Sequence, residues 1–164
     1  NPGTEGGGSK TVVGNNCLFM ISSHIAHDCK IGSNCIIANA VNIAGHVVIG
    51  NYVTIGGMTA IKQFTQIGEH CMISGGSLVR KDVPPFVKVA KEPLKFLGIN
   101  IVGLKRRLFK EENINIIKST YRKIFQNGNN ISNAINIIEK HNNLKKEEKI
   151  ITEFIKNSKQ GIIK

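Results

Sequence analysis

Large apolar residues recur at every sixth position through the first half of the chain. The series is Val13, Phe19, Ile25, Ile31, Ile37, Ile43, Ile49, Ile55, Ile61, Ile67, Ile73 and Val79. The residue directly after each is usually Gly, Ala or Ser, and the residue four places on is small or β-branched. A helix has a period of 3.6 residues and a hairpin strand a period of two, so neither explains a strict period of six.

A repeat of six residues is typical of one flat face of a triangular prism, in which a brief strand is followed by a corner. Three faces make one coil of about 18 residues, and successive coils stack as parallel strands about 4.8 Å apart. Residues one coil apart therefore lie one above another. The pattern predicts a mainly β protein with a parallel β-helix over residues 1–83.

The repeat stops at Pro84-Pro85, where the composition changes to Lys, Asn and Glu. We predict an irregular crossing segment from residue 84 to about residue 104. Helical spacing then appears three times, and Gly128 is predicted to stop the first helix. The apolar positions are Ile114, Ile117, Tyr121, Ile124 and Phe125, then Ile131, Ala134, Ile135 and Ile138, then Ile150, Ile151, Phe154 and Ile155. Residues 84–164 are thus predicted to hold the crossing segment and a small α-helical domain.

The net charge of +11 lies almost wholly in the second half of the chain. Residues 1–83 carry five Lys or Arg against four Asp or Glu, whereas residues 84–164 carry 17 against seven, which gives +10. A basic half predicts an acidic or phosphate-bearing partner, with nucleic acid as one candidate. A solvated, Lys-rich surface is the alternative interpretation.

Composition also narrows the class of protein. Aromatic residues make up only 5% of the chain, which argues against an aromatic platform for RNA. The chain has neither an apolar run long enough to span a bilayer nor a secretory leader, so we expect a cytoplasmic protein. All four cysteines occupy the small inward position of the repeat without a Cys-x2-Cys pair, which favours buried, reduced structural thiols over zinc ligands or disulfides.

One column of corners departs from the usual Asn, Gly, Asp or Ser. It holds His27-Asp28, Gly45-His46 and Gln63-Phe64, and His24 lies on the adjacent flat face. An exposed imidazole held by a carboxylate can take a proton from an alcohol near neutral pH. A glycine backbone N–H can stabilise the oxyanion of a tetrahedral intermediate. These residues therefore suit acyl transfer to a hydroxyl.

Two other interpretations of this column stay open. Surface histidines at corners are often merely tolerated polar residues. In addition, His24, His27 and His46 could form a three-histidine zinc site if chains pack edge to edge.

Several motifs in this chain resemble one family closely, in order and with uninterrupted spacing over nearly the whole length. They are His24-Ile-Ala-His27-Asp28-Cys29, Ala44-Gly45-His46, Ile55-Gly56-Gly57-Met58-Thr59-Ala60, Gln63-Phe64, Asp82-Val83-Pro84-Pro85 and Gly103-Leu104-Lys105-Arg106-Arg107. The family is that of the UDP-N-acetylglucosamine 3-O-acyltransferases of lipid A biosynthesis. The resemblance implies a left-handed β-helix and a homotrimer with active sites in clefts between prisms. It further implies that a fatty acyl group passes from acyl carrier protein to the 3-hydroxyl of the sugar.

The resemblance also implies roles for individual residues. His27 would be the general base, Asp28 its supporting carboxylate and Gly45 the oxyanion donor. His24, His46 and Gln63 would line the sugar site, while Asn100, Arg106 and Arg107 would bind nucleotide phosphates or the phosphopantetheine arm. No metal and no cofactor beyond that arm would be needed, and neither nucleic acid nor a membrane would be a stable partner. The basic half would instead attract the acidic acyl carrier protein.

Gly75 has two interpretations. The resemblance implies that this position is the floor of a groove that measures the hydrocarbon chain, and a glycine there would leave room for a longer chain of about 14 carbons. Alternatively, Gly75-Gly76 is only a tight corner that requires positive φ.

Three departures from the family pattern qualify the resemblance. The family has further coils before Gly6-Gly7-Gly8, so we expect this chain to be a carboxyl-terminal part. Lys62 occupies a position where His is common, and Val102 a position where some members have Glu. The competing functions are a zinc enzyme resembling a β-helical carbonic anhydrase and a non-catalytic relic of the acyltransferase.

Overall fold

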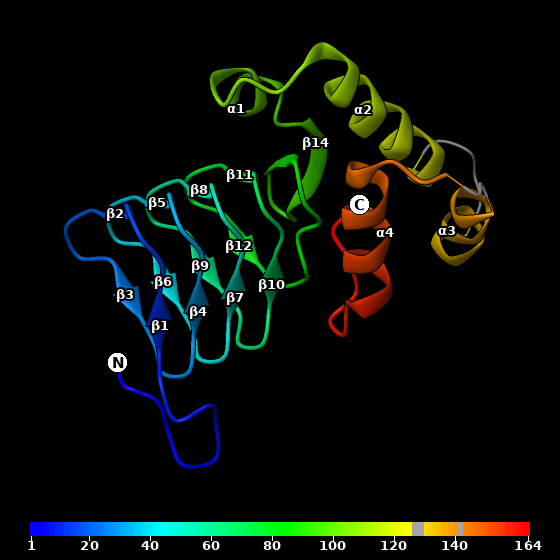
Figure 1. The fold of residues 1–164 in the computed structure, drawn as a ribbon. Coiled ribbons are helices and arrows are strands. Elements are labelled where there is room, and N and C mark those ends of the chain that lie inside the picture. Colours follow the sequence, from blue (N-terminus) through cyan, green and yellow to red (C-terminus); the bar gives the residue numbers. More distant parts are fainter. Residues whose placement is uncertain (126–129, 141–142) are drawn as a thin grey trace.

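The computed structural model describes residues 1–125, 130–140 and 143–164. Figure 1 shows a stack of short strands that forms a prism, with the amino terminus at one end and the helices gathered beyond the other end. The predicted parallel β-helix followed by helices is confirmed. No helix within the described ranges is long and apolar enough to cross a bilayer.

The prism consists of two-residue strands at the predicted spacing. They are β1 (Val12–Val13), β2 (Leu18–Phe19), β3 (His24–Ile25), β4 (Lys30–Ile31), β5 (Ile36–Ile37), β6 (Asn42–Ile43), β7 (Val48–Ile49), β8 (Thr54–Ile55), β9 (Ala60–Ile61), β10 (Gln66–Ile67), β11 (Met72–Ile73) and β12 (Leu78–Val79). Parallel pairing joins residues one coil apart, such as Val12 with Lys30 and Ile36 with Thr54. Three sheets result: β1-β4-β7-β10, then β2-β5-β8-β11-β13-β14, and β3-β6-β9-β12.

The interior of the prism is filled by the second residue of each strand and by the small residue four places on. From Ile31 to Val79 the large members of this series are at most 3% exposed. Cys29, Cys35 and Cys71 are buried free thiols, and Cys17 in the first coil is half-buried. Burial raises the pKa of the Cys71 thiol to about 12 and that of Cys35 to about 11, so both stay protonated near neutral pH. These cysteines are structural, as predicted.

The second residue of each corner pair, three places after the large apolar residue, adopts the left-handed conformation. Its φ lies between 55° and 66° at Asn16, Ser22, Asp28, Asn34, Ala40, His46, Tyr52, Met58, Phe64 and His70. This conformation costs a non-glycine residue on the order of 1 kcal/mol, and more if it is β-branched. No Val, Ile or Thr occupies the position in this series, so the sequence avoids the most strained choice.

The prediction of an irregular segment from residue 84 to about residue 104 is wrong. Strand β13 (Val87–Ala90) pairs in parallel with β11, and β14 (Lys95–Ile99) pairs antiparallel with β13. Met72 faces Lys88 and Ile67 faces Val83, so this last coil is two residues shorter than the others. A search for a strict period of six misses it for that reason.

Four helices follow the strands. They are α1 (Ile101–Arg106), α2 (Glu111–Phe125), α3 (Ile131–Glu139) and α4 (Lys146–Asn157). The three predicted helices correspond to α2, α3 and α4, whereas α1 was not predicted, and the predicted stop at Gly128 lies outside the described residues. Helices α2 and α3 each bury a mainly apolar face, as their spacing requires, whereas the buried residues of α4 are Glu147, Ile151 and Thr152.

Asp82 joins the prism to the carboxyl-terminal residues. Its buried carboxylate accepts hydrogen bonds from the backbone N–H of Gln66 at 2.7 Å and from the hydroxyl of Ser158 at 2.6 Å. A β-bridge pairs Asp82 with Ile162. A second polar contact joins α2 to the last coil, since the hydroxyl of Tyr121 donates to the carbonyl of Pro85. The helices are therefore held against the last coil by buried polar contacts as well as by apolar packing.

Candidate active site

The predicted column of corners exists and connects the sheet that contains β3 to the sheet that contains β4. We call it the His27 corner; its residues are His27-Asp28, Gly45-His46 and Gln63-Phe64. The backbone N–H of His46 donates to the carbonyl of His27 at 3.0 Å, and that of Phe64 to the carbonyl of Gly45 at 3.2 Å. The rings of His27 and His46 meet edge to face at 5.0 Å, and His46 stacks on Phe64 at 4.8 Å. The stacking of coils thus brings these side chains together.

His27 and Asp28 form a hydrogen-bonded pair. Nδ1 of His27 lies 2.9 Å from Oδ2 of Asp28. A carboxylate can only accept, so Nδ1 carries the proton and Nε2 has its lone pair free. The His27 side chain is 37% exposed while that of Asp28 is 1% exposed. The imidazole can therefore reach a substrate, and the buried carboxylate of Asp28 sets its orientation.

Asp28 is buried although it lies at a corner of the prism. An amino-terminal strap, Asn1–Lys10, crosses the corner and covers the carboxylate. Thr4 donates its backbone N–H to Oδ1 at 3.1 Å and its hydroxyl to Oδ2 at 2.7 Å. The Thr4 hydroxyl, followed by His27, holds the pKa of Asp28 well below its usual range. Sequence reasoning missed Thr4, because no repeat or spacing links it to residue 28.

Gly45 makes room for the His27 ring. A Cβ at this position would lie 2.6 Å from Cε1 and 2.7 Å from Nε2 of His27, so any larger residue would displace the imidazole. Within the described part of the chain, no group accepts a hydrogen bond from the Gly45 N–H. Such an unpaired donor, in the residue that packs against the His27 ring, can stabilise an oxyanion.

His24 and Gln63 occupy the positions in the prism that the repeat predicts. His24 begins β3 and is exposed on the adjacent face, and Gln63 is exposed two residues after the end of β9. The two residues that depart from the family pattern lie apart from the His27–Asp28 pair: Lys62 donates from Nζ to the side chain of Gln160 at 3.2 Å, and Val102 lies in α1 with 61% of its surface exposed.

Within a single chain, the geometry does not favour the zinc alternative. Donor atoms of His27, Asp28 and His46 lie within 4.8 Å of one another, and among the residues described His24 does not join this group. Oδ2 of Asp28 already accepts hydrogen bonds from His27 and Thr4, and Nε2 of His46 is 3.9 Å away from it. A metal there would displace the donors that hold the pair, so the arrangement suits proton transfer better than metal binding.

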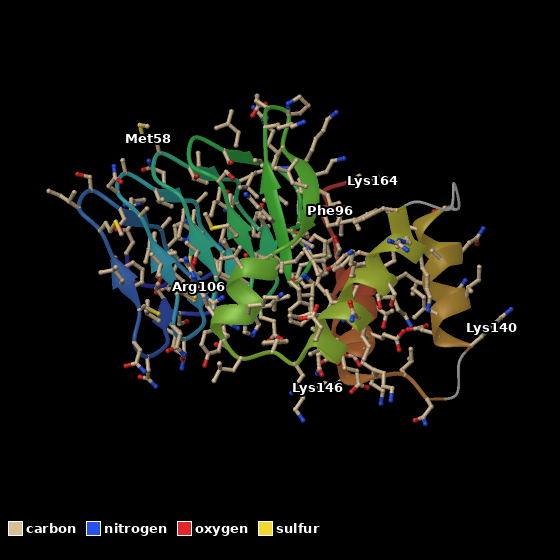
Figure 2. All side chains as sticks on the ribbon, turned by 90° about the horizontal axis from the view of Figure 1, so that it is seen from above. Met58, Phe96, Arg106, Lys140, Lys146 and Lys164 are labelled. Carbon is tan, nitrogen blue, oxygen red and sulfur yellow. The ribbon has the colours of Figure 1, made fainter. Side chains whose placement is uncertain are left out.

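Asn100, Arg106 and Arg107 lie elsewhere, over the outer face of the sheet that contains β5, β8, β11 and β13. The two arginines line a groove of about 580 Å³ with Ile36, Thr54 and Met72, and Figure 2 shows Arg106 on α1 beside the strands. The His27 corner joins the other two sheets and is therefore opposite this face. A single chain does not bring these residues together.

Two of the residues that line this groove, Asn100 and Arg107, also have structural roles. The Asn100 side chain caps α1 by accepting from the N–H of Gly103 at 3.2 Å, and it donates to the carbonyl of His70 at 2.9 Å. The Arg107 guanidinium lies over the Tyr52 ring at 5.2 Å and donates to the carbonyl of Gly103 at 3.1 Å. Burial lowers the pKa of Arg107. Because the Tyr52 ring and the Gly103 carbonyl hold the guanidinium, its remaining N–H donors have a fixed position.

Gly75 lies at a third corner, above Gly57 and Asn39. Positive φ occurs at Gly76, at 68°, and not at Gly75, so the tight-corner interpretation explains only the second glycine. A Cβ at Gly75 would approach the Gly57 carbonyl oxygen to 3.1 Å.

Comparison with known proteins points to one group of enzymes. A family described as Udp N-acetylglucosamine O-acyltransferase, Domain 2, matches residues 82–163, and one described as Bacterial transferase hexapeptide matches residues 10–45. A curated relative from Nautilia profundicola, named acyl-(acyl-carrier-protein)-UDP-N-acetylglucosamine O-acyltransferase, is 45% identical over 99% of this chain and 62% of its own length. The chain thus spans under two thirds of that relative.

Solved structures agree. The UDP-N-acetylglucosamine acyltransferase of Francisella novicida is 37% identical with a TM-score of 0.94, over 98% of this chain and 59% of its own. The Arabidopsis UDP-N-acetylglucosamine acyltransferase is 35% identical with a TM-score of 0.86, over 94% and 57%.

Proposed function

Because the chain belongs to the UDP-N-acetylglucosamine O-acyltransferase family, we propose that the protein transfers a fatty acyl group, with or without a 3-hydroxyl, from acyl carrier protein to the 3-hydroxyl of UDP-N-acetylglucosamine. This reaction would open lipid A biosynthesis. The observation that carries the proposal is the His27–Asp28 pair, in which an exposed imidazole is oriented by a buried carboxylate at 2.9 Å.

The chemistry follows from the free lone pair on Nε2 of His27. Nε2 takes the proton of the sugar 3-hydroxyl, and the oxygen of that hydroxyl attacks the carbonyl carbon of the acyl thioester. The resulting oxyanion accepts the N–H of Gly45, a contact typically worth about 3 kcal/mol. When the intermediate collapses, the C–S bond breaks and the imidazolium returns its proton to the thiolate of the phosphopantetheine arm. General base catalysis of this kind contributes about 10² to 10⁴-fold in rate.

Asp28 stabilises the imidazolium that forms during the reaction. It stays ionised because Thr4 and His27 both donate to it. His46 and Gln63 belong to the same corner, His24 lies on the adjacent face, and all three would contact the sugar. The proposed steps need no metal, since His27 itself moves the proton.

The placement of the arginines supports the homotrimer. Arg106 and Arg107 lie over the face opposite the His27 corner, so they serve the same substrate only if this face of one copy packs beside the corner of another. In that arrangement the guanidinium groups would bind the diphosphate or the phosphopantetheine arm. The basic residues 84–164 would attract the acidic acyl carrier protein. The buried free thiols agree with a cytoplasmic location.

The test is an assay of acyl transfer from acyl carrier protein thioesters to UDP-N-acetylglucosamine, with the product identified by mass spectrometry. Formation of the 3-O-acyl sugar nucleotide supports the proposal. Zinc-dependent CO₂ hydration without acyl transfer would favour the zinc enzyme, and a folded trimer with neither activity would favour the relic.

A mixing experiment tests the shared site. With both substrates below their KM values, His27→Ala chains and Arg106→Ala/Arg107→Ala chains should each have low activity alone. After unfolding and refolding together, mixed trimers should regain activity, because some interfaces then combine an intact corner with intact arginines. Mixtures no more active than the average of the two parents would place the whole site within one chain.

A further inference from the structure

The amino-terminal strap, Asn1–Lys10, also hydrogen-bonds the carboxylate of Asp28 through Thr4. Thr4 is exposed, yet it supplies three contacts to one carboxylate: its N–H to Oδ1 at 3.1 Å and to Oδ2 at 3.2 Å, and its hydroxyl to Oδ2 at 2.7 Å. Oδ2 is also the atom that accepts Nδ1 of His27 at 2.9 Å. Thr4, which lies outside the repeat, thus contacts the same oxygen that orients the imidazole.

We propose that Thr4 is a positioning residue, which fixes the Asp28 carboxylate in the orientation that holds the Nδ1–H of His27. This inference rests on the proposed function, because it assigns Thr4 to the acyl-transfer site. Thr4 acts only through Asp28 and does not need to touch the substrate.

The geometry of the carboxylate explains why an anchor is needed. A carboxylate can rotate about its Cβ–Cγ bond, but the Thr4 N–H spans both oxygens and the hydroxyl fixes one of them. The Asp28 side chain is 1% exposed, so water cannot readily replace a lost donor. Nε2 of His46 lies 3.9 Å from Oδ2 and competes for the charge. Without Thr4, the carboxylate is free to turn from His27 toward His46.

The glycines of the strap support the same role. A Cβ at Gly7 would overlap the Asp28 carboxylate, whereas a Cβ at Gly6 or Gly8 would meet nothing within 4 Å. None of the three has positive φ. Gly7 therefore permits the close approach by which the strap reaches Asp28, and its neighbours serve as matched controls.

The experiment measures kcat and KM for acyl transfer in Thr4→Val, Thr4→Ser, Gly7→Ala and Gly6→Ala. Thr4→Val keeps the shape but loses the hydroxyl, so kcat should fall about tenfold with KM for the sugar nucleotide unchanged within about twofold. Thr4→Ser restores the donor and should stay within about twofold of the wild type. Gly7→Ala should resemble Thr4→Val, and Gly6→Ala should behave as the wild type.

A second readout does not require turnover. The Nδ1–H of an imidazole bound to a carboxylate gives a low-field proton resonance in NMR spectra, which His27→Ala identifies by its loss. We expect the resonance in the wild type and in Thr4→Ser and its loss or broadening in Thr4→Val. Because no substrate is needed, this result tests the inference even if the wild-type protein transfers no acyl group, an outcome that would count against the proposed function alone.

Several outcomes would overturn the inference. Thr4→Val with the kcat of the wild type would show that the anchor is dispensable. A raised KM at unchanged kcat would instead make Thr4 a substrate contact. Retention of the low-field resonance in Thr4→Val would show that Asp28 keeps its orientation unaided.

Discussion

Two corners of the prism carry a histidine in the same position of the repeat, yet their environments are opposite. In the His27 corner, His46 adopts φ of 59° and stacks on Phe64 at 4.8 Å. In the corner formed by Asn51-Tyr52, Glu69-His70 and Pro85-Phe86, which we call the His70 corner, His70 adopts φ of 58° and stacks on Tyr52 at 4.8 Å. The backbone and the ring stacking are the same at both.

What differs is the neighbourhood. His70 is 7% exposed, packs edge to face on Phe109, and its Nδ1 has no hydrogen-bond partner within the described residues. Burial, followed by the charge of Arg107, lowers its pKa to about 4. In the His27 corner the reactive imidazole is not the equivalent His46 but His27 in the coil before it, whose side chain is 37% exposed and hydrogen-bonded to Asp28. The comparison teaches that a corner becomes chemically active when its imidazole combines an anion with access to solvent, and becomes structural when it has neither.

The largest effect at the active corner short of removing its imidazole is expected from Gly45→Ala. The added Cβ would displace the His27 ring, and we expect kcat to fall by about 100-fold, the scale of losing a general base. Steady-state kinetics measure this. Gly57→Ala is the matched control. Gly57 occupies the same corner position in another column, where an added Cβ would first meet the rotatable side chain of Asn39, with its Oδ1 at 2.8 Å. If the two variants lose equal activity, the loss is not specific to His27.

At the structural corner we expect changes in stability instead. His70→Ala removes a buried ring from between Tyr52 and Phe86 and should lower the free energy of unfolding by about 3 kcal/mol. His70→Phe keeps the stack and removes the unpaired nitrogen, so its stability should equal or exceed that of the wild type. Denaturant titration measures both. A large loss of stability in His70→Phe would show that Nδ1 has a partner in solution.

The two corners should also respond to acid in different pH ranges. The pKa of His70 is lowered from 6.5 to about 4, so the unfolded state binds more protons between these values and stability should fall as pH drops from 6.5 to 4. The pKa of Asp28 is lowered from 3.8, so the stability it adds is lost only below about pH 4. Unfolding titrations at several pH values should show that His70→Phe loses the upper range and keeps the lower one. An unchanged pH slope in His70→Phe would contradict the burial of a neutral His70.

A smaller effect is expected at the groove that lies beside the His70 corner. Arg106→Ala/Arg107→Ala should raise the apparent KM for the sugar nucleotide or acyl carrier protein by about tenfold and weaken the dependence on salt. Unchanged KM values with unchanged salt dependence would make both arginines surface solubilisers.

The third corner, which carries no histidine, should change specificity with the least effect on rate. Gly75→Met is expected to shift the preference from chains of about 14 carbons to shorter ones, since each buried methylene is worth about 0.8 kcal/mol. A series of acyl carrier protein thioesters measures the shift. A folded trimer with an unmoved preference would make Gly75 a corner residue only.

The comparison of corners also shows what the sequence can predict. The period of six predicts the sheets, the inward residues and the vertical alignment of His27, Gly45 and Gln63, because every such contact repeats at fixed spacing. Contacts that do not repeat were missed: Thr4 on Asp28, and Phe109 and Arg107 around the His70 corner. Strand β13 was missed because its coil is two residues short. Helix α1 has only one buried residue, Leu104, and therefore no periodic signal.

Comparing kcat for His27→Ala and for His70→Phe in one acyl-transfer assay, with the trimer verified for both, tests the central claim most directly. We predict a loss of at least about 100-fold for His27→Ala and a change within about threefold for His70→Phe. If His27→Ala retains more than about a tenth of the wild-type turnover, or if His70→Phe loses as much as His27→Ala, the assignment of catalysis to the His27 corner is contradicted.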